Sequence, residues 1–302
     1  MYAPQLCFFR VLDESQLHPG FLYQWFRGGE FRQQALGVQG QTDMAPYINL
    51  ADMRRIRITL PPLPEQRAIA GVLGALDDKI EVNRKVAGTA EELAQSIATG
   101  IGDAVPVGTV ATVHRKMVPT SSFAGQDVEH FSLPAFDADC LPTLESGDGI
   151  KSGKFLLDGP AVLVSKLNPH IPRVWMAVPG GTLPAVTSTE FIGLVPVGNF
   201  ASEVLWALCS TPQFSSQLGE MVKGTTGSHQ RVAPEDVLKV LVPNPNALSE
   251  DAAATITSAV QLAGAVRRES VHLAALRDTL LPKLLSGELR VHDVEDMAGV
   301  PA

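Results

Sequence analysis

A seven-residue repeat of apolar side chains in residues 64–98 constrains the fold of this chain more than any other feature. A strict heptad over this length is typical of a coiled-coil seam, so we expect one long α-helix. At about 1.5 Å per residue the helix extends roughly 50 Å, which suits a spacer. The polar Asn83 on the seam favours one register. One heptad position holds Ile69, Leu76, Asn83, Ala90 and Ile97, and the other holds Leu73, Ile80, Ala87 and Ala94.

A second long helix is expected at 248–289. Ser249 suits the N-cap, and the acidic residues directly after it favour the positive end of the helix dipole. Pro282 and Gly287 indicate where this helix frays, before a polar tail at 290–302. Because a whole globular segment joins the two helices, we expect them to lie antiparallel and to hold that segment at one end. The expected apolar stripe is Ile256, Val260, Ala263, Val266, Leu273, Leu276 and Leu280.

The chain also matches itself at a spacing of roughly 184 residues. Residues 21–31 run parallel to 204–214, and the glycine-flanked loop 37–41 corresponds to 224–228. Asp52 aligns with Asp236, and each is followed by a β-rich run that ends in proline. Residues 7–12 align with 191–196, but residues 103–188 have no counterpart in the first copy. The first globular unit is therefore expected to be incomplete.

Between the two helices, residues 103–245 are expected to form a compact, loop-rich α/β (α+β) domain. Short β-like runs separated by glycine and proline support this fold class. The runs are Val105–Val113, Ala161–Val164, Val174–Val178 and Phe191–Val197.

Composition and charge narrow the functional classes. The net charge is −8, and nine Lys and Arg against thirteen Asp and Glu give residues 103–245 a charge of 9 − 13 = −4, so tight solitary DNA binding is not expected. Three widely spaced cysteines argue against disulfides and zinc and fit a reducing cytoplasm. We find no signal peptide and no membrane-spanning run, so a cytoplasmic protein is expected.

Several stretches resemble the specificity subunits of type I restriction-modification systems, and the likeness extends over essentially the whole chain. The most specific is ITLPPLPEQRAIA at 58–70, continued by LDDKI at 76–80, which looks like the start of that family's central helix. LVSKLNP at 163–169, STEF at 188–191 and TTGSHQR at 225–231 are similar to family segments in the same order. LRDTLLPKLLSGEL at 276–289 resembles the end of the distal helix.

The resemblance implies a non-catalytic protein without cofactors that recognises double-stranded DNA and directs methylation and cleavage by modification and restriction subunits. It implies five parts: a C-terminal remnant of a first target-recognition domain at 1–63, a central conserved helix at 64–100, a second recognition domain at 103–245, a distal helix at 248–289 and a mobile tail. Since only about the last third of a first domain is expected, one chain should read one half-site. A self-dimer or a complementing half-subunit would restore two.

Candidate DNA contacts follow from side-chain chemistry in the second domain. Lys and Arg reach phosphates or guanine edges, Asn and Gln pair with adenine, and backbone amides of a glycine-bounded loop meet a phosphate. A turn at Asn168 before Pro169, and an ion pair between Arg173 and an acidic neighbour, are the structural alternatives. The candidates are Lys166, Asn168, Arg173, Thr225, Thr226, Ser228, His229, Gln230 and Arg231. For partner subunits, the exposed flanks near Glu65–Arg67 and Arg277–Lys283 are expected, with Glu65, Arg67, Arg277 and Lys283 as contacts.

Catalytic functions find no support in the motifs. The sequence contains no GxxxxGK[ST] phosphate loop, no GxGxxG that opens a helix and no HExxH, and its histidines lack metal-ligand spacing. Asp77 and Asp78 are adjacent helical residues and are expected to be solvated charges. The alternative to DNA recognition is a coiled-coil scaffold, or a relic of such a subunit, that no longer binds DNA. Convergence of Lys166, Arg173 and Arg231 on one face would favour DNA binding.

Overall fold

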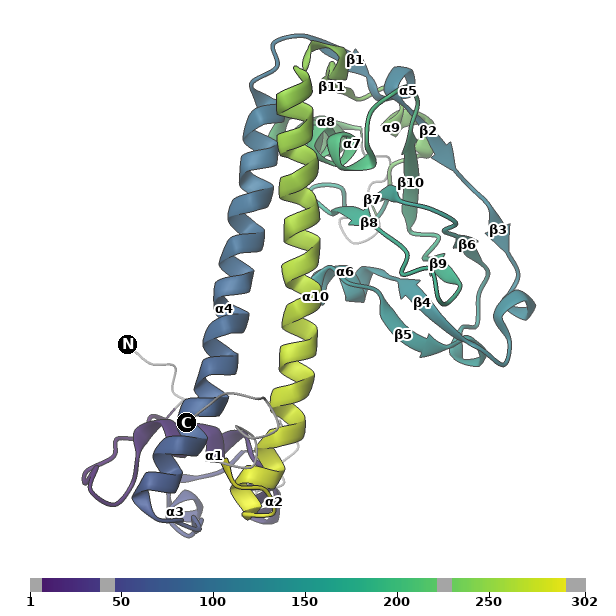
Figure 1. Cartoon of the computed structure of the whole chain (residues 1–302). Helices are drawn as coiled ribbons and strands as arrows, with labels where there is room; N and C mark the ends of the chain where they lie inside the picture. Colours follow the sequence, from purple (N-terminus) through teal and green to yellow (C-terminus); the bar gives the residue numbers. More distant parts are fainter. Residues whose placement is uncertain (1–6, 39–46, 222–229, 292–302) are drawn as a thin grey trace. The chain divides into compact units, whose positions relative to one another are not determined.

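The structure is a computed structural model that describes residues 7–38, 47–221 and 230–291. The chain divides into two compact units (Figure 1). The first unit comprises Met1–Val82 and Glu269–Ala302, and the second comprises Asn83–Arg268. Both long helices pass from one unit to the other, so we describe each unit by itself.

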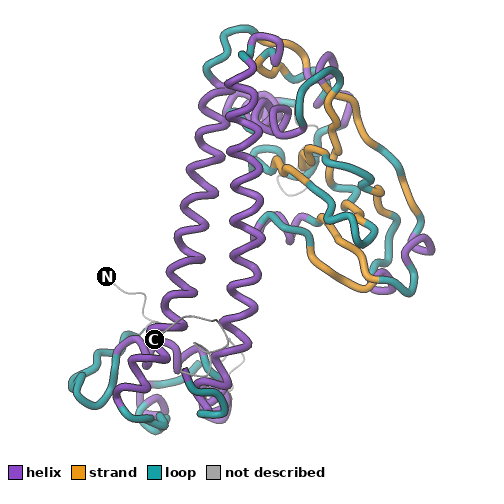
Figure 2. Tube along the Cα trace, in the orientation of Figure 1, coloured by secondary structure: helices purple, strands orange, loops and turns teal. Residues whose placement is uncertain are grey.

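The two long helices are α4, Leu63–Thr99, and α10, Glu250–Ser286, and they pack antiparallel as expected (Figures 1 and 2). The predicted seam of α4 is confirmed by burial: Leu73 and Ala94 are fully buried, and the polar Asn83 is only 2% exposed. In the first unit Ile69 and Leu73 pack with Leu281 and Leu284 of α10. The heptad pattern therefore identified the buried side of this helix correctly.

The stripe predicted for α10 is correct in its first half and wrong at one position. Ser249 caps the helix through its Oγ, which accepts a hydrogen bond from the Ala252 amide at 3.2 Å. Leu276, however, is 47% exposed, while the neighbouring Arg277 turns inward and reaches Asp77 of α4. Pro282 does not end the helix, which continues to Ser286 before Gly287 adopts a left-handed φ of 75°.

The first unit contains short helices before α4. They are α1, Pro19–Arg27, α2, Gly29–Val38, and α3, Leu50–Met53, of which α1 packs against α4 and α10 through Phe21. The second unit repeats this order with α7, Ser202–Cys209, α8, Pro212–Glu220, and α9, Pro234–Val237, as the internal match predicts.

The β-rich parts of the repeat differ between the copies. Residues 56–60 and 7–12 form no strand, whereas their counterparts lie in β11, Leu241–Pro243, and β10, Phe191–Pro196. β11 pairs with β1, Ala104–Pro106, and no strand in the described residues before 63 offers the first copy such a partner. A run with strand propensity stays irregular when it has no strand to pair with.

Two larger sheets form the centre of the second unit. A four-stranded sheet has the order β2-β10-β7-β8, and a five-stranded sheet has the order β3-β6-β9-β4-β5, with β4 and β9 parallel. The strands of the first are β2, Ala111–His114, β7, Ala161–Ser165, and β8, Val174–Ala177, together with β10. Those of the second are β3, Met117–Val118, β4, Asp127–Phe131, β5, Thr143–Ser146, β6, Lys154–Leu156, and β9, Ala185–Thr187.

The run Val105–Val113, predicted as one strand, is interrupted by the short helix α5, Val107–Val110. The Val107 and Gly108 amides donate to the carbonyls of Val240 and Leu238, both at 2.8 Å. This bend lets β1 pair with β11 while β2 pairs with β10. The remaining short elements are α6, Leu133–Asp139, and the 3-10 turns Thr120–Phe123, Gly147–Gly149 and Pro245–Ala247.

Candidate nucleic-acid interface

One end of the four-stranded sheet brings four charged residues into a row, which we call the charged edge: Arg115, Glu190, Lys166 and Arg173. Both β2 and β7 run antiparallel to β10, with His114 opposite Gly193 and Ser165 opposite Phe191. The residues after β2 and β7 and the residue before β10 therefore lie at the same end of the sheet. Arg173 joins them because Val174 pairs with Val164.

The predicted segments around Lys166 and Arg231 lie side by side. The Asn168 amide donates to the Gln230 carbonyl at 2.9 Å, and the Val232 amide donates to the Lys166 carbonyl at 3.1 Å. Leu167 and Arg231 form the isolated antiparallel bridge between these bonds. Lys166 and Asn168 thus meet Gln230 and Arg231, 62 to 65 positions further along the chain, in one short ladder beside the sheet end.

Asn168 makes the turn that its position before Pro169 predicts. Its φ is 49°, in the left-handed region that Asn tolerates, and its carbonyl accepts from the Ile171 amide at 2.8 Å. The side-chain Oδ1 is buried and has no hydrogen-bond partner in the described structure. The backbone turn and an unsatisfied side-chain amide oxygen therefore coexist at this residue.

Arg231 is held by Glu190. The Nε and Nη2 atoms of Arg231 donate to the two carboxylate oxygens of Glu190 at 3.1 and 3.2 Å. These hydrogen bonds and the negative charge raise the pKa of Arg231. Because its side chain is still 49% exposed, the Nη1 hydrogens remain available to a ligand.

Lys166 lies beside this pair in a different environment. Burial lowers the pKa of Lys166, the cations of Arg231 and Arg115 lower it further, and Glu190 opposes them. In the part of the chain that the structure describes, the Lys166 ammonium has no hydrogen-bonded or ion-paired side chain. An ammonium that is partly desolvated and close to other cations gains strongly from an added anion.

Arg173 shares the edge through its backbone, but its side chain turns away. Its Nε and Nη2 atoms donate to the carboxylate of Asp137 at 2.7 and 3.0 Å, and the side chain is 14% exposed. The ion pair with an acidic neighbour that the sequence left open is therefore present. Thr225, Thr226, Ser228 and His229 lie outside the described residues.

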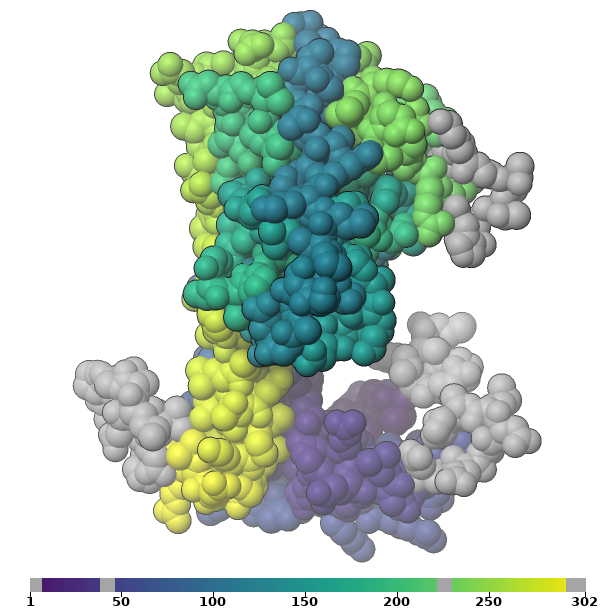
Figure 3. Space-filling view, turned by 90° about the vertical axis from the view of Figure 1, so that its right-hand side faces the viewer, coloured from purple at the N-terminus to yellow at the C-terminus, as the bar shows by residue number. Residues whose placement is uncertain are grey.

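The sequence missed three residues of this region. Glu190 lies within the quoted segment at 188–191, but only its bidentate bond to Arg231 indicates a role. Arg115 and Asp137 carried no motif: sheet register brings Arg115 to the edge, and Asp137 reaches Arg173 from helix α6. In the space-filling view, the segment that begins the domain crosses the middle of the visible face of the second unit (Figure 3).

The residues predicted to bind partners occupy two environments. Arg67 and Lys283 are exposed and Glu65 is half-buried. Arg277, in contrast, is 16% exposed and donates from Nη1 to Asp77 at 2.8 Å and from Nε to Asp278 at 2.8 Å. Its guanidinium is thus engaged within the first unit.

Asp77 is not the solvated charge that the sequence suggested. Its carboxylate also accepts from Arg27 Nη1 at 2.6 Å and from Gln24 Nε2 at 3.0 Å, and its side chain is 24% exposed. Burial acts to raise the pKa of Asp77, but the hydrogen bonds from Arg277 and Gln24 and the charge of Arg27 outweigh it and lower the pKa. Asp78, one residue on, is exposed.

The helix pair of the second unit carries an apolar groove on its outer surface. Val86 and Leu93 of α4 and Ala259 and Leu262 of α10 line it, and both leucines are almost half exposed. Soluble proteins seldom expose neighbouring large apolar side chains without a binding role.

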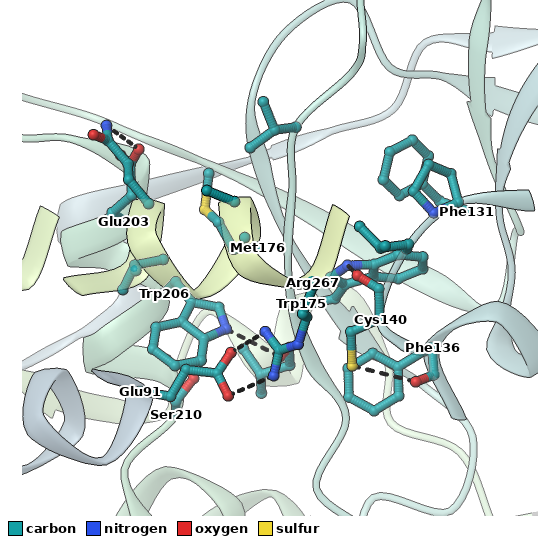
Figure 4. A pocket seen from close by; sticks show the side chains of 18 of the residues that line it. Glu91, Phe131, Phe136, Cys140, Trp175, Met176, Glu203, Trp206, Ser210 and Arg267 are labelled. Atoms are coloured by element: carbon teal, nitrogen blue, oxygen red, sulfur yellow. Dashed lines mark hydrogen bonds and ion pairs between the residues drawn. The ribbon is translucent and has the colours of Figure 1, made fainter. Parts of the chain in front are cut away.

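A cleft of about 630 Å³ lies between the helix pair and the sheets of the second unit (Figure 4). Arg267 forms a bidentate pair with Glu91, with one bond of 2.7 Å, and both tryptophans that line the cleft donate to backbone carbonyls. Burial raises the pKa of the Cys140 thiol, which donates to the Phe136 carbonyl. The pair of Arg267 with Glu91 joins α10 to α4, the other bonds lie within the domain, and none of them places a nucleophile beside a base.

Within the described residues, no group of three His, Cys, Asp or Glu side chains is placed to hold a metal ion. The same residues contain no helix of the length and apolarity that a bilayer crossing requires.

Comparison with one solved structure agrees with this architecture. The family described as "Type I restriction modification DNA specificity domain" matches residues 3–91. No match was found among curated proteins. The crystal structure of the type I restriction-modification S subunit from M. genitalium superposes with a TM-score of 0.56 at 15% identity, covering 90% of this chain and 74% of that one. The HsdS subunit from Thermoanaerobacter tengcongensis aligns at 19% identity over 91% of this chain and 71% of that chain, with a TM-score of 0.36. Residues 3–91 therefore match the DNA specificity domain of type I restriction-modification systems, and the chain shares the fold of the S subunit from M. genitalium.

Proposed function

We propose that residues 103–245 read one DNA half-site with the charged edge and the ladder beside it. The observation that supports this most is the meeting of Lys166, Asn168, Gln230 and Arg231 at one end of one sheet. Their side chains offer cations for phosphates and amides for base edges, and recognition of a DNA sequence needs both. Of the three cations whose convergence would favour DNA binding, Lys166 and Arg231 lie together, whereas the Arg173 side chain pairs with Asp137.

Arg231 is proposed as the main base-reading residue. Glu190 occupies its Nε and one Nη2 hydrogen, so the guanidinium is fixed in direction before DNA arrives. The remaining N–H groups match the O6 and N7 acceptors of guanine. Because the side chain is already ordered, less conformational entropy is lost on binding.

The other candidates take supporting roles. Asn168 and Gln230 suit adenine, and Lys166 suits a phosphate. Arg173, held by Asp137, is proposed as a phosphate contact at the end of the row. Thr225, Thr226, Ser228 and His229 are proposed as contacts of the connecting loop. The domain charge of −4 implies that partner subunits add to the affinity.

The helix pair is proposed as the surface for the modification subunits, to which restriction subunits add in the complete assembly. Exposed Arg67, Lys283 and the half-buried Glu65 in the first unit, and the apolar groove in the second, support this assignment. We expect Arg67→Glu to weaken co-purification with the modification subunit. Arg277→Glu should also weaken co-purification. Because it breaks the ion pair with Asp77 as well, Asp77→Ala is the control for the loss of that pair. Unchanged co-purification of Arg67→Glu would count against this surface.

Each copy of the chain is proposed to read a single half-site in the cytoplasm. Residues 7–38 and 47–63 contain counterparts of α7, α8 and α9 but no sheet, so they present no second charged edge. This proposal divides the chain into a remnant at 1–63, helices at 64–100 and 248–289, a recognition domain at 103–245 and a tail at 290–302. A second copy or a complementing half-subunit is proposed as a source of a second half-site.

The test is selection of binding sites from random duplexes by the full chain co-expressed with its modification subunit. Arg231→Ala should flatten the preference at one base pair, a loss of about 1–3 kcal/mol of discrimination. Lys151→Ala is the matched control, because Lys151 is an exposed cation that donates to a backbone carbonyl away from the charged edge. If neither wild type nor variant selects a sequence although the complex forms, the scaffold is the correct function.

A further inference from the structure

Most cations of the second domain are engaged by groups within the domain. Lys116 pairs with Asp158, Arg173 with Asp137, Arg231 with Glu190 and Lys239 with Asp236. Lys151 and Lys154 donate to nearby backbone or hydroxyl oxygens. Among the described residues of the domain, Arg115 and Lys166 are the cations whose side chains have no hydrogen-bonded or ion-paired partner.

These two cations line the same hollow, of about 450 Å³. The sheet explains their proximity, since Arg115 follows β2 and Lys166 follows β7, on either side of the start of β10. His114 adds an imidazole to the lining, and Glu235 is the carboxylate among the lining residues. The cations outnumber that carboxylate, and the Lys166 ammonium already sits where burial and Arg115 lower its pKa.

Most of the remaining lining is apolar, and part of it is exposed. Met117 and Phe155 are opposite each other in the β3–β6 pair, and Met117 is 64% exposed. Phe191 and Ile192, both almost fully buried, line the hollow as well. An anion alone would gain nothing from this apolar lining, whereas a phosphate with a sugar and base attached would contact both kinds of surface.

We infer that this hollow takes one nucleotide of the DNA strand: Arg115 and Lys166 contact its backbone phosphate, and Met117 and Phe155 contact its deoxyribose and base. The inference rests on the proposed function and extends the charged edge onto the five-stranded sheet. Arg115 and Met117 belong to the segment at 115–118, which joins the two sheets. The hollow fixes the position of the backbone while Arg231 reads bases.

The test is the salt dependence of DNA binding by the full chain with its modification subunit, measured by fluorescence anisotropy on a selected duplex. Each lost phosphate contact lowers the slope of log K against log salt by about 0.9. Arg115→Ala and Lys166→Ala should each lower the slope by about that amount and weaken binding about tenfold at low salt. Met117→Ala should weaken binding roughly threefold without a change of slope. Lys151→Ala, the control, should leave both quantities unchanged.

The outcomes separate this inference from the proposed function. If Arg115→Ala and Lys166→Ala bind with the wild-type slope while Arg231→Ala loses its base preference, the hollow does not contact DNA and only this inference fails. If Lys151→Ala lowers the slope as much as Arg115→Ala does, the inference also fails, because the effect would then reflect the net charge of the domain rather than a contact in the hollow. A wild-type complex that binds no duplex refutes the proposed function itself.

Discussion

The carboxylate of Asp77 is the centre of an ion-pair network in the first unit, and Asp77→Ala tests its contribution to stability. The substitution removes bonds of 2.6 and 2.8 Å to Arg27 and Arg277 and one of 3.0 Å to Gln24. It also leaves the Arg277 guanidinium, 16% exposed, with only Asp278 as a partner in the described structure. A buried charge that loses its partner costs about 3–5 kcal/mol, but water reaches these side chains in part. We therefore expect a loss of about 1–2 kcal/mol.

Asp78→Ala is the matched control. Both substitutions gain the same helix propensity, about 0.6 kcal/mol, but Asp78 is exposed and its loss removes no bond to α1. Urea unfolding followed by circular dichroism gives the free energy of unfolding for both variants. Asp77→Ala should be less stable than Asp78→Ala by about 1–2 kcal/mol. Equal stabilities would refute the network as a source of stability.

The same pair of variants gives a pH test with a defined sign. The network lowers the pKa of Asp77 below that of the unfolded chain, which is near 3.9. The stabilisation is therefore fully present above about pH 4 and is lost as the pH falls through the lower folded value. The stability difference between wild type and Asp77→Ala should be constant from pH 5 to 8 and should shrink below pH 4. A difference that grows on acidification contradicts this sign.

Two further predictions concern the second unit. A methyl group at Gly147 would lie 1.9 Å from the Phe123 carbonyl oxygen, so Gly147→Ala should lower the free energy of unfolding by about 1–3 kcal/mol. Gly149→Ala, which meets open space, is the control and should not lower it. Equal effects of the two substitutions in urea unfolding would contradict the packing. Burial raises the pKa of the Cys209 thiol, whereas Cys7 is exposed. A thiol reagent at pH 8 should therefore modify Cys7 at once and Cys209 only when the protein unfolds. Equally fast labelling of both thiols would show that the core around Cys209 is open.

The long helices were predictable because their stabilisation is periodic in sequence. Ile69, Leu73 and Ala94 recur at heptad spacing, and each is buried. The prediction failed at Leu276, where the inward position belongs to Arg277. Apolar periodicity cannot identify a charged residue as inward when its partner, Asp77, lies 200 residues away.

The five-stranded sheet was not predictable in the same way. Its strands are two to five residues long, and the parallel pairing of β4 with β9 joins segments more than fifty residues apart. Such pairing depends on tertiary contacts rather than on local propensity. The candidate site divides similarly. Side-chain chemistry selected Lys166 and Arg231, but Glu190 was revealed by its bond from Arg231 and Arg115 by the sheet register.

Mapping of methylated bases at single-base resolution, after co-expression with the modification subunit, tests DNA recognition by the second domain most directly. The account predicts a short methylated motif that Lys151→Ala preserves and Arg231→Ala changes or abolishes, with a palindromic motif if two copies pair and a one-sided motif if one copy acts alone. A motif that Arg231→Ala leaves intact, or a stable complex that methylates no motif, would contradict it.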